Sequence, residues 1–538
     1  MQISMILTTG FLAFIFSCFA TAVMSYISLA VPIGPWIEPT LALLGIIAVR
    51  VCMRRAEMRD KEQGVALATI AGGISGIIAS ACAWTFPALH FLDPELFRAW
   101  FEQPIYFALL VGAVVFLAGG AGLLFAHLFE KQLLVDSTMP FPVAQMLAKT
   151  ISAQNQLRKG YELLAGAVSL LLFSSLQTFS KIIPHKLVML SSRTIGWLTL
   201  PTIIFRLDVL PMLWAIGFIT GHVIAVPFAV GALAKIFIVG PLHTLFFTNL
   251  NVDNFLLALC CGIIVQGALM SFADAPKFIS KMIHFMRYSF ATRTIPYTNI
   301  SLADYLPLII AGCVALIIFF SWFAFSFAAQ LFVMVGTALC AYQLIMFMGK
   351  VGLAPLGRFA TFVMLPGLVL FGFNAMQATL VSAFVEISGG VAADALSGSK
   401  LGQLSHIHGK LVHKFQWFAL VVTSLAIGMV FWFLINHFGL GSAELVAQKA
   451  QSRALLINAY DFDFYVILIG ILFGFVLKKV KINASLVLGG LLMPIDWSLI
   501  IVLSGLTTYL VKNKEAYYPF WSGVFAASSI WMLIKALI

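Results

Sequence analysis

The chain has 538 residues, of which 61% are apolar and only 10% are charged. Soluble proteins carry about 25% charged residues, so a water-soluble enzyme is excluded, because too few charges remain to hydrate its surface. A receptor or anchored enzyme with one or two spans is also excluded, since no polar stretch is long enough for a separate domain. The composition predicts a polytopic integral membrane protein whose function lies inside the lipid bilayer.

The charge balance indicates how the chain is oriented. Lys and Arg number 32 against 21 Asp and Glu, an excess that in membrane proteins marks cytoplasmic loops facing anionic lipid, not nucleic-acid binding. The first apolar run, residues 3–31, is too long for a signal peptide and is expected to be a membrane helix. Basic residues follow the second run, so we expect this loop and the N-terminus to be cytoplasmic. They are Arg50, Arg54, Arg55, Arg59 and Lys61.

Apolar runs of helical length follow one another along the chain. They predict an all-α fold of about 14–16 transmembrane helices, and their solid apolar character excludes a barrel of alternating strands. Some runs are long enough for two spans, or for one span with a break. The runs cover residues 7–30, 36–54, 64–89, 105–127, 161–182, 209–248, 252–273, 303–324, 326–349, 359–385, 415–436, 463–477, 484–511 and 519–537, with shorter candidates at 133–149 and 186–205.

A basic stretch near the middle of the chain separates two halves of similar size. It contains Lys277, Lys281, Arg287 and Arg293, and we expect it to be a cytoplasmic linker. The predicted domains are an N-terminal transmembrane half, residues 1–293, and a C-terminal transmembrane half, residues 294–538.

Two Met-Pro segments predict breaks in membrane helices. In Met139-Pro140-Phe141-Pro142, two prolines remove two backbone donors, and non-helical backbone at membrane depth is tolerated only beside protein or a water-filled cavity. The alternative is a surface loop followed by an ordinary helix from Val143. A second segment, Met493-Pro494, lies in the other half, and this pairing fits either an internal duplication or chance.

Ionisable residues follow in a stretch of small residues, 386–402. Glu386, Asp394 and Lys400 lie there, and ionisable groups within a span are costly and by default indicate function. Six residues separate Asp394 from Lys400, which is not a facing spacing on a regular helix. A direct pair would therefore need a break at Gly398. The alternative is a loop edge in solvent.

Other polar residues have structural explanations beside functional ones. Asn374 and Gln377 share a helix face and either line a polar path or bond neighbouring helices. His406, His408 and His413 are interpreted as part of a basic cytoplasmic loop, because no carboxylate or cysteine completes a metal site. The chain has no GxxxxGK[ST] loop for ATP, and no HExxH motif that would favour an intramembrane enzyme.

Four segments in order resemble the oligopeptide transporter (OPT) superfamily, which includes the yellow-stripe-like metal-chelate carriers. Met139 to Pro142 is similar to its Leu-Pro-(Tyr/Phe)-Pro-Ser-Gly-x-Ala segment. Asp208-Val-Leu-Pro211 with Gly217 and Gly221 resembles its Asp-x-Ser-Pro…Gly region. Ala393 to Leu396 with Lys400 and Gly402 resembles Ser-Asp-Leu-Met-x-Asp-x-Lys-Thr-Gly, and Met493-Pro494 a late Leu-Pro segment.

The chain departs from the family pattern at several polar positions. Gly398 stands in place of the second aspartate, Val143 and Ala144 replace Ser-Gly, and Leu210 replaces a serine. These positions would bond a peptide or chelate, so the resemblance implies the family without a particular substrate.

The resemblance implies a secondary active transporter in the cell membrane, not an enzyme, with two related halves and broken or re-entrant helices. It implies proton-coupled uptake of small peptides or metal chelates, with protons as coupling ion and no cofactor or resident metal. We expect Glu386 and Asp394 to carry the coupling proton, since an apolar setting lets a carboxyl group change charge near neutral pH. The expected substrate-binding residues are Pro140, Phe141, Pro142, Gln145, Asn374, Gln377, Asp394, Lys400, Met493 and Pro494. The oligomeric state stays open.

Three rival functions fit the same composition. A sodium-coupled amino-acid or nucleobase symporter also uses broken helices. A channel would conduct without coupling, and an intramembrane lipid-modifying enzyme would alter lipid instead of moving solute.

Overall fold

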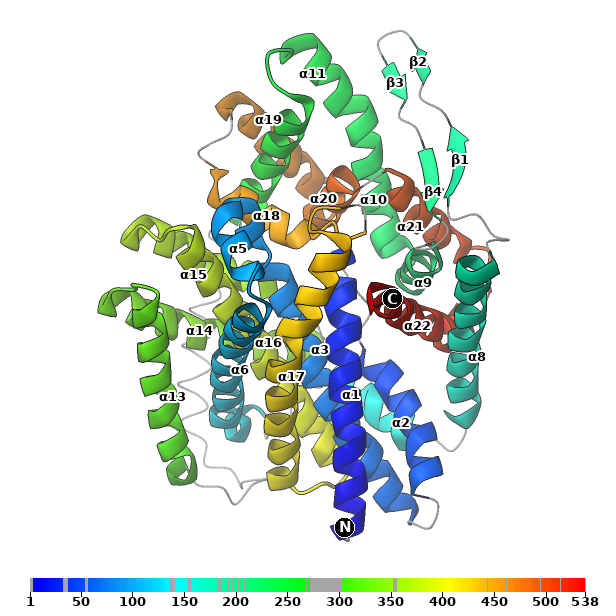
Figure 1. Cartoon of the computed structure of the whole chain (residues 1–538), viewed down its shortest axis with the longest axis vertical. Coiled ribbons are helices and arrows are strands. Elements are labelled where there is room, and N and C mark those ends of the chain that lie inside the picture. The colour runs from blue at the N-terminus through cyan, green and yellow to red at the C-terminus, as the bar shows by residue number, and fades with distance from the viewer. Residues whose placement is uncertain are drawn as a thin grey trace. The chain divides into compact units, whose positions relative to one another are not determined.

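The computed structural model describes most of the chain (Figure 1). The structure describes residues 3–537 except for the following: 32–36, 54–56, 135–138, 140, 153–155, 181–185, 191–192, 196–197, 201–202, 207–209, 268, 271–301, 352–355, 443, 460–462, 494 and 513. The expected basic linker, Pro140, Pro494 and Asp208 lie outside the described residues.

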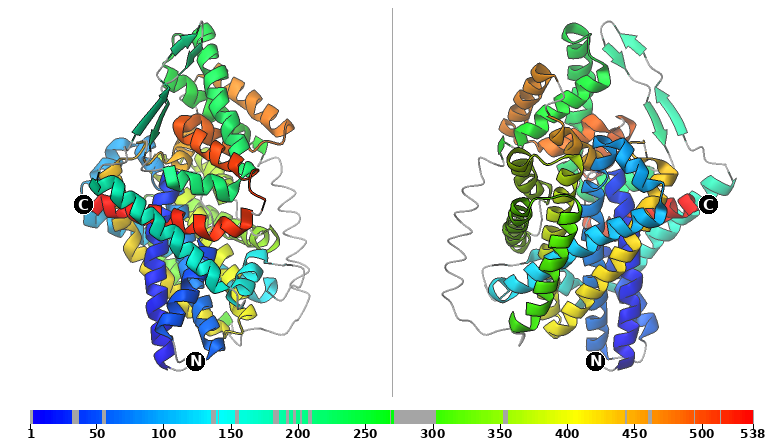
Figure 2. Two further views of the ribbon diagram at one scale, coloured as in Figure 1. Left: turned by 90° about the vertical axis from the view of Figure 1, so that its right-hand side faces the viewer. Right: turned by 60° about the vertical axis from the view of Figure 1, so that its left-hand side comes forward.

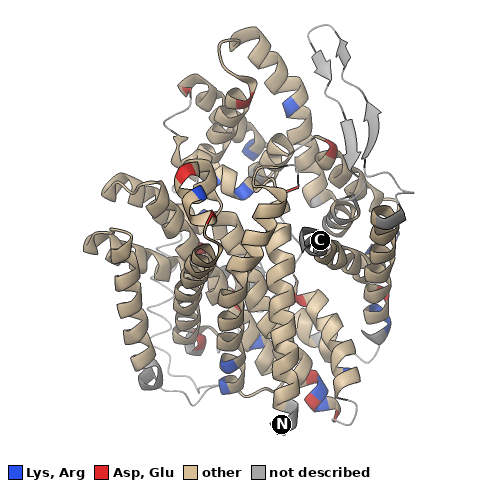
Figure 3. Cartoon of the chain, in the orientation of Figure 1, with Lys and Arg blue, Asp and Glu red and all other residues tan. Residues whose placement is uncertain are grey.

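The described residues are mainly helical, as the apolar runs predict. Four apolar helices are shorter than a span: Val252–Gly267, Pro307–Trp322, Leu356–Phe371 and Ile495–Thr507. Eight helices are long and apolar enough to cross a membrane, namely Ile6–Ala30, Met58–Leu92, Pro104–Glu130, Arg158–Thr178, Ile224–Phe246, Phe327–Met346, Ala375–Leu404 and Gly409–Phe438. Figure 3 shows how few charged residues these ribbons carry. The predicted class, a polytopic all-α membrane protein, is confirmed.

The chain forms two compact units. The first unit contains Met1–Ser25, Trp36–Gly160 and Ser271–Phe433, and the second contains Tyr26–Pro35, Tyr161–Met270 and Leu434–Ile538. Each unit combines segments from both sides of residue 293. The expected halves, 1–293 and 294–538, are divisions along the chain, whereas the two units are defined by contacts in space. The division into halves therefore stays a prediction.

Helices that lie wholly or mainly in the first unit are α1 (Ile3–Ala30), α2 (Glu38–Cys52), α3 (Met58–Thr85), α4 (Ala88–Leu92), α5 (Pro94–Phe101), α6 (Pro104–Leu133), α7 (Pro142–Ser152), α13 (Leu302–Trp322), α14 (Phe327–Val351), α15 (Leu356–Phe371), α16 (Ala375–Leu404) and α17 (Gly409–Phe438). Those of the second unit are α8 (Gln156–Ser175), η1 (Leu176–Ser180), α9 (Leu210–Thr220), α10 (His222–Ala234), η2 (Lys235–Val239), α11 (Gly240–Phe246), α18 (Gln448–Ile457), α19 (Phe464–Lys479), α20 (Ala484–Leu492), α21 (Ile495–Thr507), η4 (Lys514–Tyr517) and α22 (Tyr518–Leu537).

Helix α16 is the central element of the first unit. It contacts α3, α6, α7, α14 and α15, and every residue from 378 to 397 is buried. Small residues let the neighbours come close. The Ser388 hydroxyl donates to the Ala118 carbonyl of α6 at 2.7 Å, and a Cβ atom on Gly122 would lie 2.4 Å from the Ser388 carbonyl oxygen. Close packing of this kind holds helices together in lipid.

Several apolar runs are divided, which confirms the prediction of broken helices. The run 209–248 holds α9, α10, the π-helical η2 and α11, with Gly221 at φ 60° between α9 and α10. The run 359–385 is interrupted between α15 and α16, and the run 484–511 between α20 and α21. Helix α7 has 11 residues, about 16 Å at 1.5 Å per residue, and is too short to cross about 30 Å of hydrocarbon.

Residues 186–206 contradict the expectation of a short span. They form two antiparallel pairs, β1 (Lys186–Leu190) with β4 (Ile203–Arg206) and β2 (Arg193–Ile195) with β3 (Leu198–Leu200). Figure 2 shows them from two sides. The β2–β3 pair is nested within the β1–β4 pair along the chain. β-Branched residues favour strands, and Lys186, Arg193 and Arg206 are costly to place in lipid.

The contact between α6 and α16 gives a first prediction. Gly122→Ala places a methyl group against the backbone of Ser388, so we expect overpacking that destabilises the fold by about 1–3 kcal/mol. The thermal unfolding midpoint of the purified protein in detergent measures the effect. Gly10→Ala is the matched control, because a Cβ atom at Gly10 of α1 meets nothing within 4 Å. Equal midpoints for the two variants would contradict the proposed close contact.

Candidate functional site

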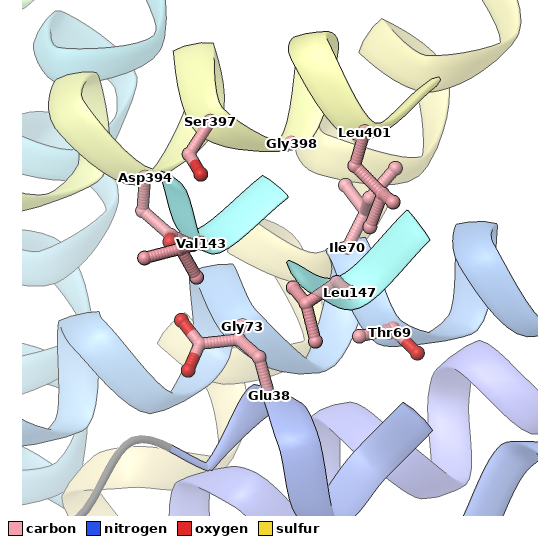
Figure 4. A pocket seen from close by; sticks show the side chains of 10 residues that line it. All are labelled: Glu38, Thr69, Ile70, Gly73, Val143, Leu147, Asp394, Ser397, Gly398 and Leu401. Atoms are coloured by element: carbon pink, nitrogen blue, oxygen red, sulfur yellow. The ribbon is translucent and has the colours of Figure 1, made fainter. Parts of the chain in front are cut away.

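A small cavity lies inside the first unit where four helices meet. Helices α3 and α7 contact each other and both α2 and α16, and all four helices contribute to the wall (Figure 4). The cavity has room for about one water molecule. It is lined by Glu38, Thr69, Ile70, Gly73, Val143, Leu147, Asp394, Ser397, Gly398 and Leu401.

Two carboxyl groups meet in this cavity. Asp394 on α16 and Glu38 on α2 point toward one another (Figure 4), and their side chains are hydrogen-bonded. Asp394 is only 7% exposed, and Glu38 is partly buried. A carboxylate only accepts hydrogen bonds, so a bond between two carboxyl groups requires a proton on one of them. The structure therefore brings together two carboxyl groups whose hydrogen bond depends on one of them being protonated.

Local features position the pair. Glu38 lies in the first turn of α2, where the helix dipole favours a negative charge. Glu38 is therefore well placed to be the carboxylate that accepts the hydrogen bond from Asp394. Gly73 of α3 lies beside both carboxyl groups, since a Cβ atom there would be 3.1 Å from Asp394 Oδ2 and 3.1 Å from Glu38 Cγ. Thr69 donates its hydroxyl to the Val65 carbonyl of its own helix at 2.8 Å.

The predicted Met-Pro-Phe-Pro break has a structural role. Phe141 has a positive φ of 43° and is buried, and its N–H donates to the Gly349 carbonyl of α14 at 2.8 Å. This backbone donor is therefore bonded to α14, so the broken segment lies beside protein, one of the two settings in which such backbone is tolerated. Pro142 begins α7, the position that proline suits best. The cavity is instead lined one turn later, by Val143 and Leu147, while Gln145 is exposed.

Asn374 and Gln377 form a helix cap. The Asn374 side chain accepts from the Gln377 N–H at 2.8 Å, and Gln377 Oε1 accepts from the Asn374 N–H at 3.2 Å. The Gln377 amide also donates to the Phe323 and Ala324 carbonyls. This capping box starts α16 and fixes the preceding turn. The structural interpretation of these two residues fits their contacts, and we leave them out of the proposed site.

Helix α16 is continuous through Gly398, so Asp394 and Lys400 do not face each other as a direct pair. Lys400 Nζ instead donates to Gln403 Oε1 at 3.0 Å. Glu386 is fully buried in the same helix but does not line the cavity. The acids of the 386–402 segment thus lie inside the protein, not at a loop edge in solvent.

The other predicted site residues lie in the second unit. Met493 is buried between α20 and α21, and its carbonyl accepts from Lys235 Nζ at 3.4 Å. Pro494 lies outside the described residues. The predicted helix break is thus present, and Lys235 is the polar side chain that contacts it.

Sequence reasoning missed Glu38, Thr69 and Gly73. Glu38 carried a usable signal, because it is an acid at the start of the second apolar run.

The prediction that His413 belongs to a basic loop with His406 and His408 is wrong for His413. His406 and His408 are exposed, whereas His413 is buried within α17 and contacts Glu130 of α6 at 2.7 Å. Among the described residues, no three His, Cys, Asp or Glu side chains are arranged to hold a metal ion.

A multi-pass bundle with broken helices and a buried carboxyl pair defines the class of membrane transporters. A family model described as OPT oligopeptide transporter protein matches residues 7–530, nearly the whole chain. The chain therefore belongs to the OPT oligopeptide transporter family, whose members are transporters and not enzymes. No single curated protein matches the chain.

The carboxyl pair gives a spectroscopic prediction. Infrared spectroscopy detects the C=O stretch of a protonated carboxyl group, which a carboxylate lacks. We expect Glu38→Gln and Asp394→Asn each to change the position of the same absorption at neutral pH. In each variant an amide replaces one carboxyl group, so the hydrogen bond of the remaining carboxyl group changes and its C=O stretch changes with it.

Glu386→Gln is the matched control, because Glu386 is a buried acid on the helix of Asp394 but away from the cavity. It should leave this absorption unchanged. Two separate absorptions, each lost only with its own residue, would contradict a shared proton.

Proposed function

We propose that the protein is a proton-coupled secondary active transporter that takes up small peptides, or peptide-like compounds such as metal chelates, across the cell membrane. Glu38 and Asp394 are its coupling site. The observation that carries this proposal is the hydrogen bond between the carboxyl groups of Asp394, which is buried, and Glu38, which is partly buried, because this bond requires a proton on one of them.

Loading and release of this proton change the force between two helices. With one proton, the pair attracts and holds α2 against α16. Without it, two carboxylates in a site with room for about one water molecule repel each other. Deprotonation therefore favours a conformation in which the helices separate and water enters. A ligand that binds the separated state better would shift the same equilibrium, which couples proton movement to substrate movement.

The cavity is far too small for a peptide, and this supports a division of labour. Ligand sites for drug-sized molecules occupy about 300–1,000 Å³, whereas this cavity holds about one water molecule. The pair then serves the coupling ion in a closed conformation, and substrate enters a wider space that opens elsewhere in the transport cycle. Glu386 remains a second candidate for the coupling proton, since it is fully buried in α16.

Orientation follows from the basic residues between the second and third helices. Arg50 ends α2, and Arg59 and Lys61 begin α3, so the positive-inside rule places this connection in the cytoplasm. A cytoplasmic N-terminus follows only when both α1 and the 15-residue α2 cross the membrane, as the two apolar runs predict.

Substrate class is tested by thermal shift. Purified protein in detergent is heated with di- and tripeptides, glutathione, free metal ions and chelated metal ions. A specific binder at 100 times its Kd stabilises the fold by about 2.7 kcal/mol, so we expect a higher unfolding midpoint with peptides or chelates. A shift only with free amino acids or nucleobases, and only when sodium is present, would favour the sodium-coupled alternative.

Coupling is tested in proteoliposomes with the compound found in this way. An inward proton gradient should drive accumulation above the external concentration, with or without sodium. Asp394→Asn and Glu38→Gln should abolish this accumulation but keep exchange of labelled for unlabelled substrate, because the amides keep the hydrogen bond and cannot release a proton.

Glu386→Gln separates the two candidate acids on α16. If it alone abolished proton-driven accumulation, Glu386 would be the coupling residue and the assignment to the carboxyl pair would be wrong. Downhill flux without accumulation in the wild type would indicate a channel.

A further inference from the structure

A second group of ionisable side chains lies in the first unit, away from the carboxyl pair. His127 and Glu130 are three residues apart on α6, and His413 and Gln416 are three residues apart on α17. This spacing places each pair on one face of its helix. Glu130 is 4% exposed, His413 is 5% exposed and Gln416 is fully buried. We name His127, Glu130 and His413 the imidazole–carboxylate cluster.

The cluster is tightly connected. His413 Nε2 lies 2.7 Å from Glu130 Oε2. The rings of His127 and His413 are stacked, with centroids 3.8 Å apart and planes inclined by 28°. His127 Nε2 lies 3.2 Å from Gln416 Oε1. These contacts leave the three ionisable groups within a few ångströms of one another, inside the protein.

Charge balance limits what this cluster can hold. A buried carboxylate without a partner is costly, so an ionised Glu130 needs a positive charge beside it. Two stacked imidazole rings cannot both be charged cheaply, because like charges in contact disfavour each other. The balanced state therefore has one negative carboxylate and one imidazolium. Such a group gains or loses a single proton as a unit.

Gln416 connects the cluster to the helix of the coupling site. Its Nε2 donates to the Ala395 carbonyl of α16 at 2.8 Å, and Ala395 directly follows Asp394. The same Nε2 lies 3.4 Å from the position that a Cβ atom would take on Gly398, which lines the cavity. Gln416 is thus the contact through which a change at His127 would reach the wall of the cavity.

We propose that the imidazole–carboxylate cluster is a second proton-binding site, linked through Gln416 to α16, so that the protonation of each site influences the other. The influence on transport rests on the proposed function, whereas proton binding by the cluster does not. Ionisable groups that the packed helices bring near the cluster are Asp394 on α16, Tyr342 on α14, whose ring packs on Phe129, and the exposed Lys414 on α17.

Histidine-selective NMR tests proton binding. The full chain, labelled with ¹³C at histidine Cε1 and purified in detergent without substrate, is titrated with acid, and a soluble paramagnetic agent identifies buried rings by their protection. We expect the protected signal that is missing in His413→Gln to change charge within the pH range in which the protein stays folded. Glu130→Gln should lower its charged fraction at least tenfold, because the partner carboxylate is gone.

His408→Gln is the matched control, since His408 is exposed just before α17 and its removal should leave the His413 signal unchanged. A His413 ring that stays neutral throughout the folded range, or keeps its charge in Glu130→Gln, would overturn the second site. If the variants do not fold, the wild-type titration alone tests the proposal. The second site would be overturned if none of the protected histidine rings changed charge.

Infrared spectroscopy tests the link. The pH at which the Glu38–Asp394 carboxyl absorption disappears should shift in Glu130→Gln, and Gln416→Met should remove this shift while leaving the His413 titration in place. An unchanged midpoint in Glu130→Gln would overturn the link. Both readouts are made without substrate, so failure of proton-driven uptake would refute the proposed function and leave this result standing.

Discussion

The hydrogen bond between Glu38 and Asp394 is the interaction on which the functional interpretation depends. Carboxyl groups are expensive at membrane depth, and two of them in contact are stable only while they share a proton. The four surrounding helices provide the setting. Helix α2 contributes Glu38 in its first turn, and α16 contributes Asp394 near the C-terminal end of its buried stretch. Helix α3 contributes Gly73, where a side chain would crowd both acids, and α7 closes the cavity with Val143 and Leu147.

Helix α16 can carry acids because protein surrounds it. All of its residues from 378 to 397 are buried, so none of its polar groups in that stretch has to face lipid. Small residues make this possible, since bulky ones would keep α6 and α14 away. Gly389 illustrates the point, because a Cβ atom there would lie 2.3 Å from Leu344 Cδ1 of α14. Because the helices are closely packed, a change in volume at the cavity displaces the helices around it.

For the proline segment and for the imidazole–carboxylate cluster, contacts with other helices reveal the structural role of each residue. Phe141 accepts a strained backbone conformation, and its N–H is bonded to Gly349, which fixes the start of α7 against α14. That segment positions the wall of the cavity. His413, by contrast, lies three residues after the exposed Lys410, and the regular helix α17 turns it inward, where it contacts Glu130.

The sequence by itself determined the membrane class, most of the helical segments and their breaks, and it singled out Asp394 as a candidate. Apolar runs, prolines and isolated acids carry local costs that do not depend on neighbours. It wrongly predicted a short span at 186–205, where apolar content favours a span but β-propensity favours the strands that the structure shows. For Asp394 it named no partner on another helix. Only the tertiary structure decided that the partner of Asp394 is Glu38, more than 350 residues earlier, and that His413 is buried. Hydrogen bonding and charge compensation act between side chains that packing brings together, and distance along the chain does not report which helices will meet.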